Sequence, residues 1–147
     1  MSITLLLLRH GQIKANRQGR WHGSTDSPLT LKGRIQASLT ARVLAQDHNI
    51  TAAYTSPLQR CIHTGRLATA RLPITPSVID GLAEMSVGDW EGEKYSRLQS
   101  EHQLIDHCTG DIRCRPPNGE SLADVAQRMS DSIAQITQAH KQGTVLV

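Results

Sequence analysis

The sequence predicts an α/β protein in which a mainly parallel β-sheet is covered by helices on both faces. Short apolar runs alternate along the chain with stretches whose apolar residues recur at helical spacing, and this alternation is typical of parallel sheets. The first run, Ile3 to Leu8, is apolar at nearly every position, as expected for a strand buried on both faces. A chain of 147 residues suits one domain, so we expect a single domain over residues 1–147.

The first helix is predicted to follow Thr30, which can cap it, and to end near His48 and Asn49. Residues 50–55 then predict a second strand. In Ser56-Pro57 we expect Ser56 to cap the next helix and Pro57 to be its first residue. The apolar positions that define the first helix are Leu31, Ile35, Leu39, Val43 and Leu44.

Residues 73–79 predict a third strand near an edge of the sheet, because two prolines within it cannot donate to a strand neighbour. Residues 81–118 contain many turn-forming residues, and we expect only short helices around Arg97 to His107. A long amphipathic helix is predicted to follow Ser121 and to stop at Gly143. A fourth strand then begins at Thr144.

Composition excludes several classes of function. The net charge is only +3 and no dense Lys/Arg run occurs, which argues against nucleic-acid binding. The leading apolar run is too short for a membrane span or a signal peptide. Three cysteines, Cys61, Cys108 and Cys114, predict reduced thiols and a cytoplasmic location. Their spacing to His63 and His107 matches no ordinary zinc pattern, so we expect no metal.

Polar side chains follow three of the predicted strands. Arg9 and His10 follow the first, Arg60 follows the second, and Glu84 follows the third. Ligands of parallel sheets bind beyond the carboxyl ends of the strands, so these residues should share one rim. Arginines can hold a phosphoryl group while a histidine attacks phosphorus, and a carboxylic acid can protonate the leaving oxygen. Asn16 can donate a further hydrogen bond.

Five segments in order resemble the histidine phosphatase superfamily, in its phosphoglycerate-mutase-like branch. They read LLLLRHGQIKAN, DSPLTLKGRIQA, TSPLQRCIHT, LAEMSVGDWEG and PPNGESLADVAQRM. The resemblance covers residues 3–147 and implies a three-layer α/β/α sandwich with no metal and no cofactor. It implies a phosphomonoesterase that forms a phosphohistidine and takes a small phosphorylated substrate, acting as a monomer or a homodimer.

The resemblance assigns a role to each residue of this sequence that matches a motif of the family. The resemblance makes His10 the phosphate acceptor, Arg9 and Arg60 its phosphate-binding arginines, and Glu84 the proton donor. It also assigns substrate binding to Asn16 and, on a looser match, to the loop His22, Gly23 and Ser24. Trp90 and Glu91 are expected to pack and to pin the segment that carries Glu84, and Asp26 is expected to form a cap or turn.

The family pattern has a second catalytic histidine in a Ser-His-Gly motif after a strand such as TVLV, and this sequence ends at Val147. We therefore expect the C-terminal part of the fold to be missing and activity to be impaired, since losing one preorganised donor typically costs about a hundred- to a thousandfold in rate. The segment EMSVGDWE is similar to α-ribazole phosphatases of cobalamin biosynthesis, which makes α-ribazole 5′-phosphate a candidate substrate. The alternatives are a phosphoglycerate-type mutase and a non-catalytic phosphoanion-binding pseudo-phosphatase.

Overall fold

The computed structural model of the chain describes residues 2–46, 49–105 and 110–147. Four strands form one parallel sheet in the order β1-β4-β2-β3, with β1 at Ile3–Leu6, β2 at Ile50–Thr55, β3 at Ser77–Val78 and β4 at Gly143–Leu146. The α-helices are α1 (Lys14–Gln18), α2 (Leu31–Leu44), α3 (Gln59–Ala68), α4 (Tyr95–His102) and α6 (Leu122–Ala139). Two 3₁₀ turns, η1 (Asp80–Leu82) and η2 (Gly88–Trp90), lie between β3 and α4.

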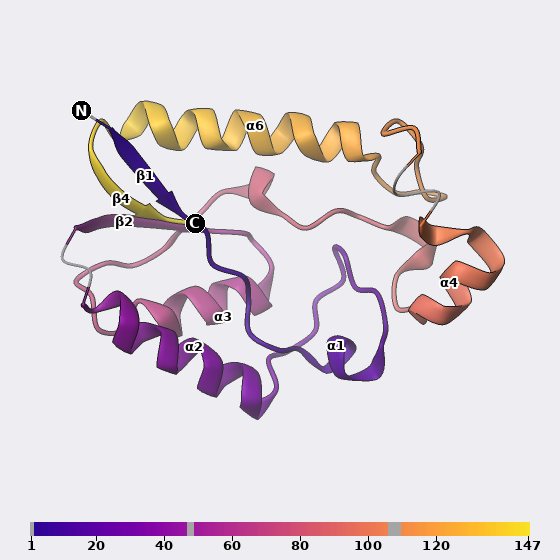
Figure 1. Cartoon of the computed structure of the whole chain (residues 1–147), viewed down its shortest axis with the longest axis horizontal. Helices are drawn as coiled ribbons and strands as arrows, with labels where there is room; N and C mark the ends of the chain where they lie inside the picture. Colours follow the sequence, from indigo (N-terminus) through magenta and orange to yellow (C-terminus); the bar gives the residue numbers. More distant parts are fainter. Residues whose placement is uncertain (1, 47–48, 106–109) are drawn as a thin grey trace.

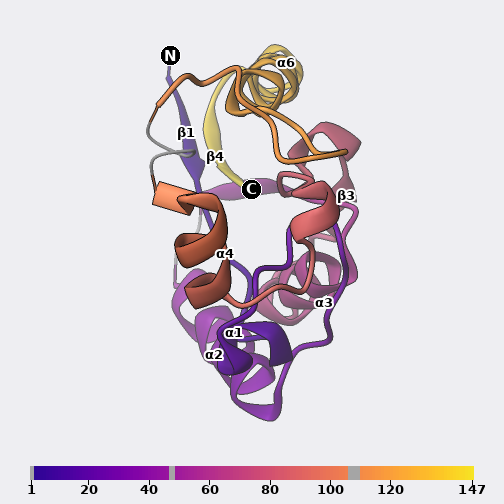
Figure 2. The same cartoon turned by 90° about the vertical axis from the view of Figure 1, so that its right-hand side faces the viewer.

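The predicted three-layer arrangement is confirmed. Helix α6 covers one face of the sheet, and α2 and α3 lie side by side on the other (Figure 1). The view turned by 90° shows the strands between these two layers (Figure 2). Helix α4 lies at the end of the molecule, away from the strands (Figure 1).

The central strands are buried on both faces. In β4, Val145 packs with Ile136 of α6 on one side, whereas Leu146 packs with Leu44 of α2 on the other. Ala53 of β2 belongs to the same cluster as Leu146. Successive side chains of a strand point to opposite faces, so a strand between two helical layers needs apolar residues at nearly every position.

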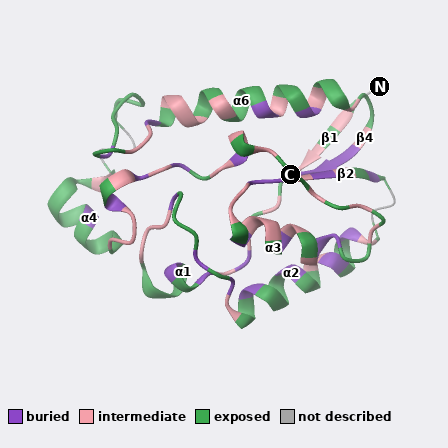
Figure 3. Ribbon diagram, turned by 180° about the vertical axis from the view of Figure 1, so that it is seen from behind, coloured by how far each residue is buried: buried purple, intermediate pink, exposed green. Residues whose placement is uncertain are grey.

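Of the apolar positions predicted for the first helix, only Leu44 faces the core. Helix α2 is capped by Thr30, whose hydroxyl accepts from the backbone N–H of Gly33 as expected. Its buried positions, however, are Gly33, Ala37, Ala41 and Leu44, and the outer face is exposed (Figure 3). Small residues face inward because α2 packs closely against α3. The residues left exposed are Leu31, Ile35, Leu39 and Val43.

The helix predicted to start at Pro57 begins instead at Gln59, with Leu58 as its N-cap. The Ser56 hydroxyl accepts from the backbone N–H of Leu58 and also hydrogen-bonds the thiol of Cys61. The first helical N–H groups, of Gln59 and Arg60, donate to the Asp26 carboxylate at 2.8 and 3.4 Å. A carboxylate 33 residues away in sequence therefore caps α3, which agrees with the cap expected of Asp26.

Other boundaries also differ. The first strand ends at Leu6, although the N–H of Leu8 still donates to the carbonyl of Val147 at 2.8 Å. The burial expected on both faces of this run is wrong, because β1 lies at an edge of the sheet and Thr4 and Leu7 are exposed. The third strand contains only Ser77 and Val78, at the edge as predicted, since the prolines shorten it. The long helix ends at Ala139, and Gly143 opens β4 with φ of 91°.

One short helix is Tyr95–His102, which begins two residues before the expected span, and residues 104–105 within that span are helical as well. His48, His107 and Cys108 lie outside the residues that the structure describes. In the described ranges, Cys61 and Cys114 are free thiols, and no helix there is long and apolar enough to cross a membrane.

Candidate active site

A cavity of about 430 Å³ opens at the carboxyl ends of the strands. Arg9 and His10 line it beyond β1, Ser56 lines it beyond β2, and Glu84 faces it from the segment after η1. Leu146 and the last residue, Val147, complete this side. Arg9, His10, Ser56 and Glu84, which follow three different strands, therefore share one rim, whereas Arg60, expected at the same rim, does not line this cavity.

His10 is held in one tautomer. Its Nδ1 lies 2.8 Å from the carbonyl oxygen of Gly11, and because a carbonyl only accepts, Nδ1 carries the proton. The lone pair of a neutral ring is then on Nε2. Burial lowers the pKa of His10, and the charges of Arg60 and Arg9 lower it further. The ring is therefore neutral and nucleophilic at neutral pH.

Gly11 fixes the loop that carries His10. Its N–H donates to Oγ1 of Thr64 at 3.1 Å, and this hydroxyl in turn donates to the carbonyl of Arg60. A side chain on Gly11 would meet the backbone of Gly33 in α2. Thr64 was not singled out from the sequence, although its position four residues after Arg60 in a helix places both on one face.

Arg60 is a buried cation, with 1% of its side chain exposed. Nη1 donates to the carbonyl of Thr25 at 3.0 Å and Nη2 to that of Gly23 at 2.7 Å. Asp26 lies 3.8 Å away and compensates its charge. Among the residues that the structure describes, its buried Nε has no hydrogen-bond partner. Arg60 does not line the cavity.

Glu84 and Arg9 are both exposed side chains that face the cavity. Oε1 of Glu84 accepts from the N–H of the next residue, Met85, at 2.9 Å. Arg9 also lines a second cavity of about 210 Å³ with His10 and Gly11. A cation, an imidazole and a carboxyl group therefore converge on one space.

The other predicted binding residues lie outside the linings of these two cavities. Asn16 uses its Oδ1 to accept from the backbone N–H of Ile13 at 3.2 Å, which starts α1. Gly23 and Ser24 lie in the loop that contacts Arg60 and Glu91. Nδ1 of His22 is buried and unpartnered among the described residues.

Glu91 joins two segments of the site. Its carboxylate accepts backbone N–H groups of Gly23, Ser24 and Thr25 on one side and of Val87 on the other. The carbonyls of Gly23 and Thr25 are the groups that hold Arg60. The pinning role expected of Glu91 is confirmed, and Trp90, which is 5% exposed, packs in the core as expected.

Cys61 also lines the cavity, but its chemistry is unsuited to compete with His10. Burial raises the pKa of its thiol, and the thiol form is a poor nucleophile. Over residues 2–46, 49–105 and 110–147, no group of three or more His, Cys, Asp or Glu side chains could hold a metal ion.

The chain matches a known protein family over most of its length. The family described as Histidine phosphatase superfamily (branch 1) matches residues 5–147. A Mycobacterium tuberculosis protein described as bifunctional is 35% identical over 144 residues, or 97% of this chain, but the chain spans only 40% of that protein's length. The adenosylcobalamin/alpha-ribazole phosphatase of Escherichia coli K12 is 30% identical over 145 residues, 97% of this chain and 71% of that protein.

Among solved structures, the alpha-ribazole phosphatase from Shigella flexneri superposes with a TM-score of 0.83. The match has 30% sequence identity and covers 97% of this chain and 71% of that one. The similarity therefore extends over sequence and fold together.

Proposed function

This chain belongs to the histidine phosphatase superfamily (branch 1), and from this premise we propose that it is a phosphomonoesterase that works through a phosphohistidine on His10. The observation that carries the proposal is the cavity that His10, Arg9 and Glu84 line together. The hydrogen bond from His10 Nδ1 to Gly11 leaves Nε2 as the nucleophilic atom.

In the first step, the lone pair of His10 Nε2 attacks phosphorus, and the bond from phosphorus to the ester oxygen breaks. The carboxylic acid of Glu84 donates its proton to that oxygen, which leaves as an alcohol. In the second step, water attacks phosphorus, the N–P bond breaks, and the carboxylate of Glu84 takes the proton of the water. The product is inorganic phosphate.

The two arginines stabilise the charge of the transferred group. Phosphoryl transition states spread charge over the equatorial oxygens, and preorganised cations stabilise that charge. Arg9 reaches the cavity directly. Arg60 lines neither cavity of the site, so it contributes as a nearby buried positive charge that hydrogen bonds to Gly23 and Thr25 hold in place. A cation that is already fixed costs little reorganisation.

α-Ribazole 5′-phosphate is our first candidate substrate. The support is the similarity to phosphatases whose names include alpha-ribazole, in sequence and in fold. A panel of α-ribazole 5′-phosphate, phosphoserine and 3-phosphoglycerate would rank substrates by kcat/KM. Interconversion of phosphoglycerates faster than hydrolysis would favour a mutase instead.

The test of the proposal is a single turnover with p-nitrophenyl phosphate, followed by mass spectrometry for acid-labile, base-stable phosphate. We expect phosphate on His10, and we expect none in His10→Ala. The matched control is His63→Ala, because His63 is exposed on α3 and lines neither cavity of the site. Phosphate or vanadate binding without any phosphohistidine would refute catalysis and favour a pseudo-phosphatase.

The same experiment measures turnover. The impaired turnover anticipated from the sequence stays a prediction, and it would appear as a fast phosphorylation of His10 followed by slow release of phosphate. A cytoplasmic location and a monomeric or homodimeric state also belong to the proposal. Cell fractionation and sedimentation would test them.

A further inference from the structure

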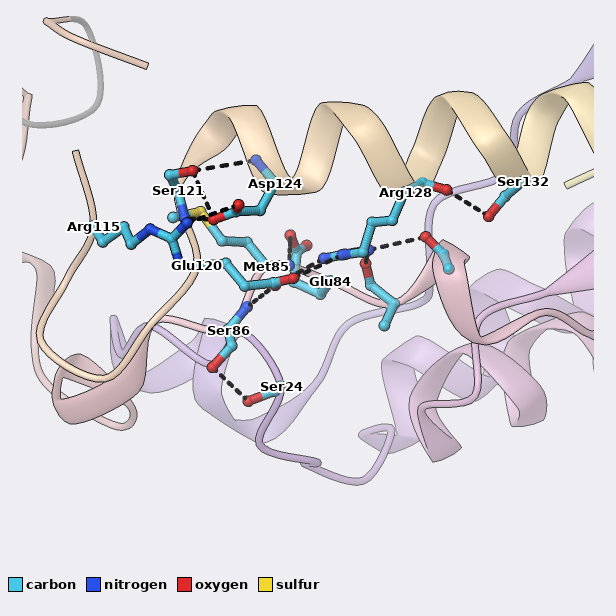
Figure 4. A network of polar contacts seen from close by, with 12 residues as sticks. Ser24, Glu84, Met85, Ser86, Arg115, Glu120, Ser121, Asp124, Arg128 and Ser132 are labelled. Atoms are coloured by element: carbon cyan, nitrogen blue, oxygen red, sulfur yellow. Dashed lines mark hydrogen bonds and ion pairs between the residues drawn. The ribbon is translucent and has the colours of Figure 1, made fainter. Parts of the chain in front are cut away.

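Arg128 of α6 connects this helix to the segment that carries Glu84 (Figure 4). One end of its guanidinium, Nη1, donates to the backbone carbonyls of Gly81, at 2.9 Å, and Ala83. The other side binds Glu120 in a two-bond ion pair, with Nε to Oε1 at 2.8 Å and Nη2 to Oε2 at 2.9 Å. Such a paired geometry fixes both the distance and the plane of the two groups.

Glu120 continues the connection to the same segment. Its Oε2 also accepts from the backbone N–H of Ser86 at 2.8 Å. Hydrogen bonding from Arg128 lowers the pKa of Glu120, and the Ser86 N–H lowers it further, so the carboxylate stays ionised near neutral pH. The Arg128–Glu120 pair therefore holds the backbone before Glu84 at Gly81 and Ala83, and after it at Ser86.

The segment that carries Glu84 depends on hydrogen bonds from other parts of the chain to fix its backbone. Residues 83–87 belong to no helix or strand, so no regular hydrogen-bonding pattern fixes their backbone. In the part of the chain that the structure describes, the hydrogen bond of the Glu84 side chain goes to its own neighbour, Met85. Its direction in the cavity thus depends on how the backbone on both sides is held.

We propose that Arg128 and Glu120 are positioning residues that aim the carboxyl group of Glu84 at the leaving oxygen of the ester bound at His10. Neither residue lines the cavity, so both act through Glu84. This inference rests on the proposed function, in which Glu84 is the proton donor. The alternative is that the Arg128–Glu120 pair only helps α6 to pack against η1, since these two elements are in contact.

Esters with different leaving groups separate these two explanations. The leaving group of p-nitrophenyl phosphate departs as a phenolate that needs no proton, whereas an alkyl phosphate such as ethyl phosphate needs a proton donor. General acid catalysis contributes about a hundred- to ten-thousandfold in rate. If the carboxyl group of Glu84 is misplaced, the rate should therefore fall for the alkyl ester and not for p-nitrophenyl phosphate.

The experiment measures the rate of phosphoryl transfer to His10 in single turnovers of both esters, for Arg128→Met, Arg128→Lys and Glu120→Gln. We expect the ethyl phosphate rate to fall at least tenfold in Arg128→Met, and the p-nitrophenyl phosphate rate to stay within about threefold. Arg128→Lys keeps the charge and loses the two-bond geometry, so it should fold and show the same selective loss to a smaller degree.

The matched control is Arg115→Met. Arg115 pairs with Asp124 on the first turn of the same helix at 2.9 Å, but 58% of its side chain is exposed, and this bond goes to α6 and not to the Glu84 segment. We expect both rates to be unchanged in this variant.

A double variant shows whether Arg128 acts through Glu84. If it does, adding Arg128→Met to Glu84→Gln should slow the ethyl phosphate reaction less than about twofold further, because the acid is already absent. If the rate losses of Arg128→Met and Glu84→Gln multiplied in the double variant, or if Arg128→Met slowed both esters equally, the positioning role would be overturned. The proposed function would stand in either case. A wild-type chain that neither ester phosphorylates at His10 would overturn the proposed function, and this inference with it.

Discussion

Replacing Glu91 by glutamine should destabilise the protein far more than a surface carboxylate would. Five hydrogen bonds reach this side chain: Oε1 accepts from the N–H and hydroxyl of Ser24 and from the N–H of Val87, and Oε2 accepts from the N–H groups of Gly23 and Thr25. In Glu91→Gln one oxygen becomes an amide nitrogen. Whichever oxygen is replaced, at least two hydrogen bonds are lost. The new amide NH₂ group then faces backbone N–H groups, which are also donors and cannot pair with it.

The magnitude follows from this count. Each lost bond to a partly exposed, charged acceptor is worth about 1–2 kcal/mol, so the free energy of unfolding should fall by about 2–4 kcal/mol. For a chain of this size the midpoint of thermal unfolding should fall by about 5–15 °C. The measurement is thermal unfolding at pH 7, followed by circular dichroism.

The control is Glu93→Gln, the same chemical change two residues away. The Glu93 carboxylate pairs with Arg97 at 3.2 Å, and 56% of the Arg97 side chain is exposed. An exposed pair contributes about 0–1 kcal/mol, so the unfolding midpoint should change by no more than a few degrees. Equal shifts in the two variants would show that Glu91 does not hold the loop at Gly23.

The pH dependence gives an independent check. Burial by itself raises the pKa of Glu91, but the hydrogen bonds donated by Thr25, Val87 and Ser24 together hold it below its ordinary value. A depressed folded pKa adds stability above the unfolded pKa, and this stability is lost as the pH falls through the folded pKa. The difference between wild type and Glu91→Gln should therefore be full near neutral pH and shrink below about pH 4.3. A difference independent of pH would refute this reasoning.

Three further predictions concern His10 and the two main helices. Burial lowers the pKa of His10, so the acid limb of the phosphorylation rate should lie below pH 6.5; a limb above that value, in stopped-flow measurements, would contradict a buried neutral ring. Ser121→Ala removes the capping box of α6 and should cost about 1 kcal/mol in urea unfolding, whereas no change would mean that the cap is dispensable. In α2, Ala41→Leu should cost about 1–3 kcal/mol because Ala41 is buried, with 3% exposed, while Leu39→Gln should stay within about 0.5 kcal/mol because Leu39 is 50% exposed; the reverse order would place the apolar stripe of α2 in the core.

Local patterns carried most of the fold prediction. Thr30 was predicted as a cap because a cap and its N–H partner lie within three residues of one another. Ser121, predicted only to precede the long helix, is a cap as well in the structure. Burial on both faces was predicted for the apolar run Ile3 to Leu8, but β1 is an edge strand of the sheet, with Thr4 and Leu7 exposed. The strand buried on both faces is β4, which lies between β1 and β2. The inward face of α2 could not be predicted, because small residues give no hydrophobic signal and only the close approach of α3 selects them.

In the same way, the sequence by itself determined which chemical groups the site contains, and the tertiary structure decided how they are held. Arg9, His10, Arg60 and Glu84 were recognisable because each follows a strand and carries a group suited to phosphoryl transfer. Their supports come from residues far away in the chain: Glu91 reaches Gly23 across 68 positions, and Arg128 reaches Ala83 across 45. No short-range pattern encodes such pairs, because a hydrogen bond between distant segments depends on how the layers pack, and this packing exists only once the whole chain has folded.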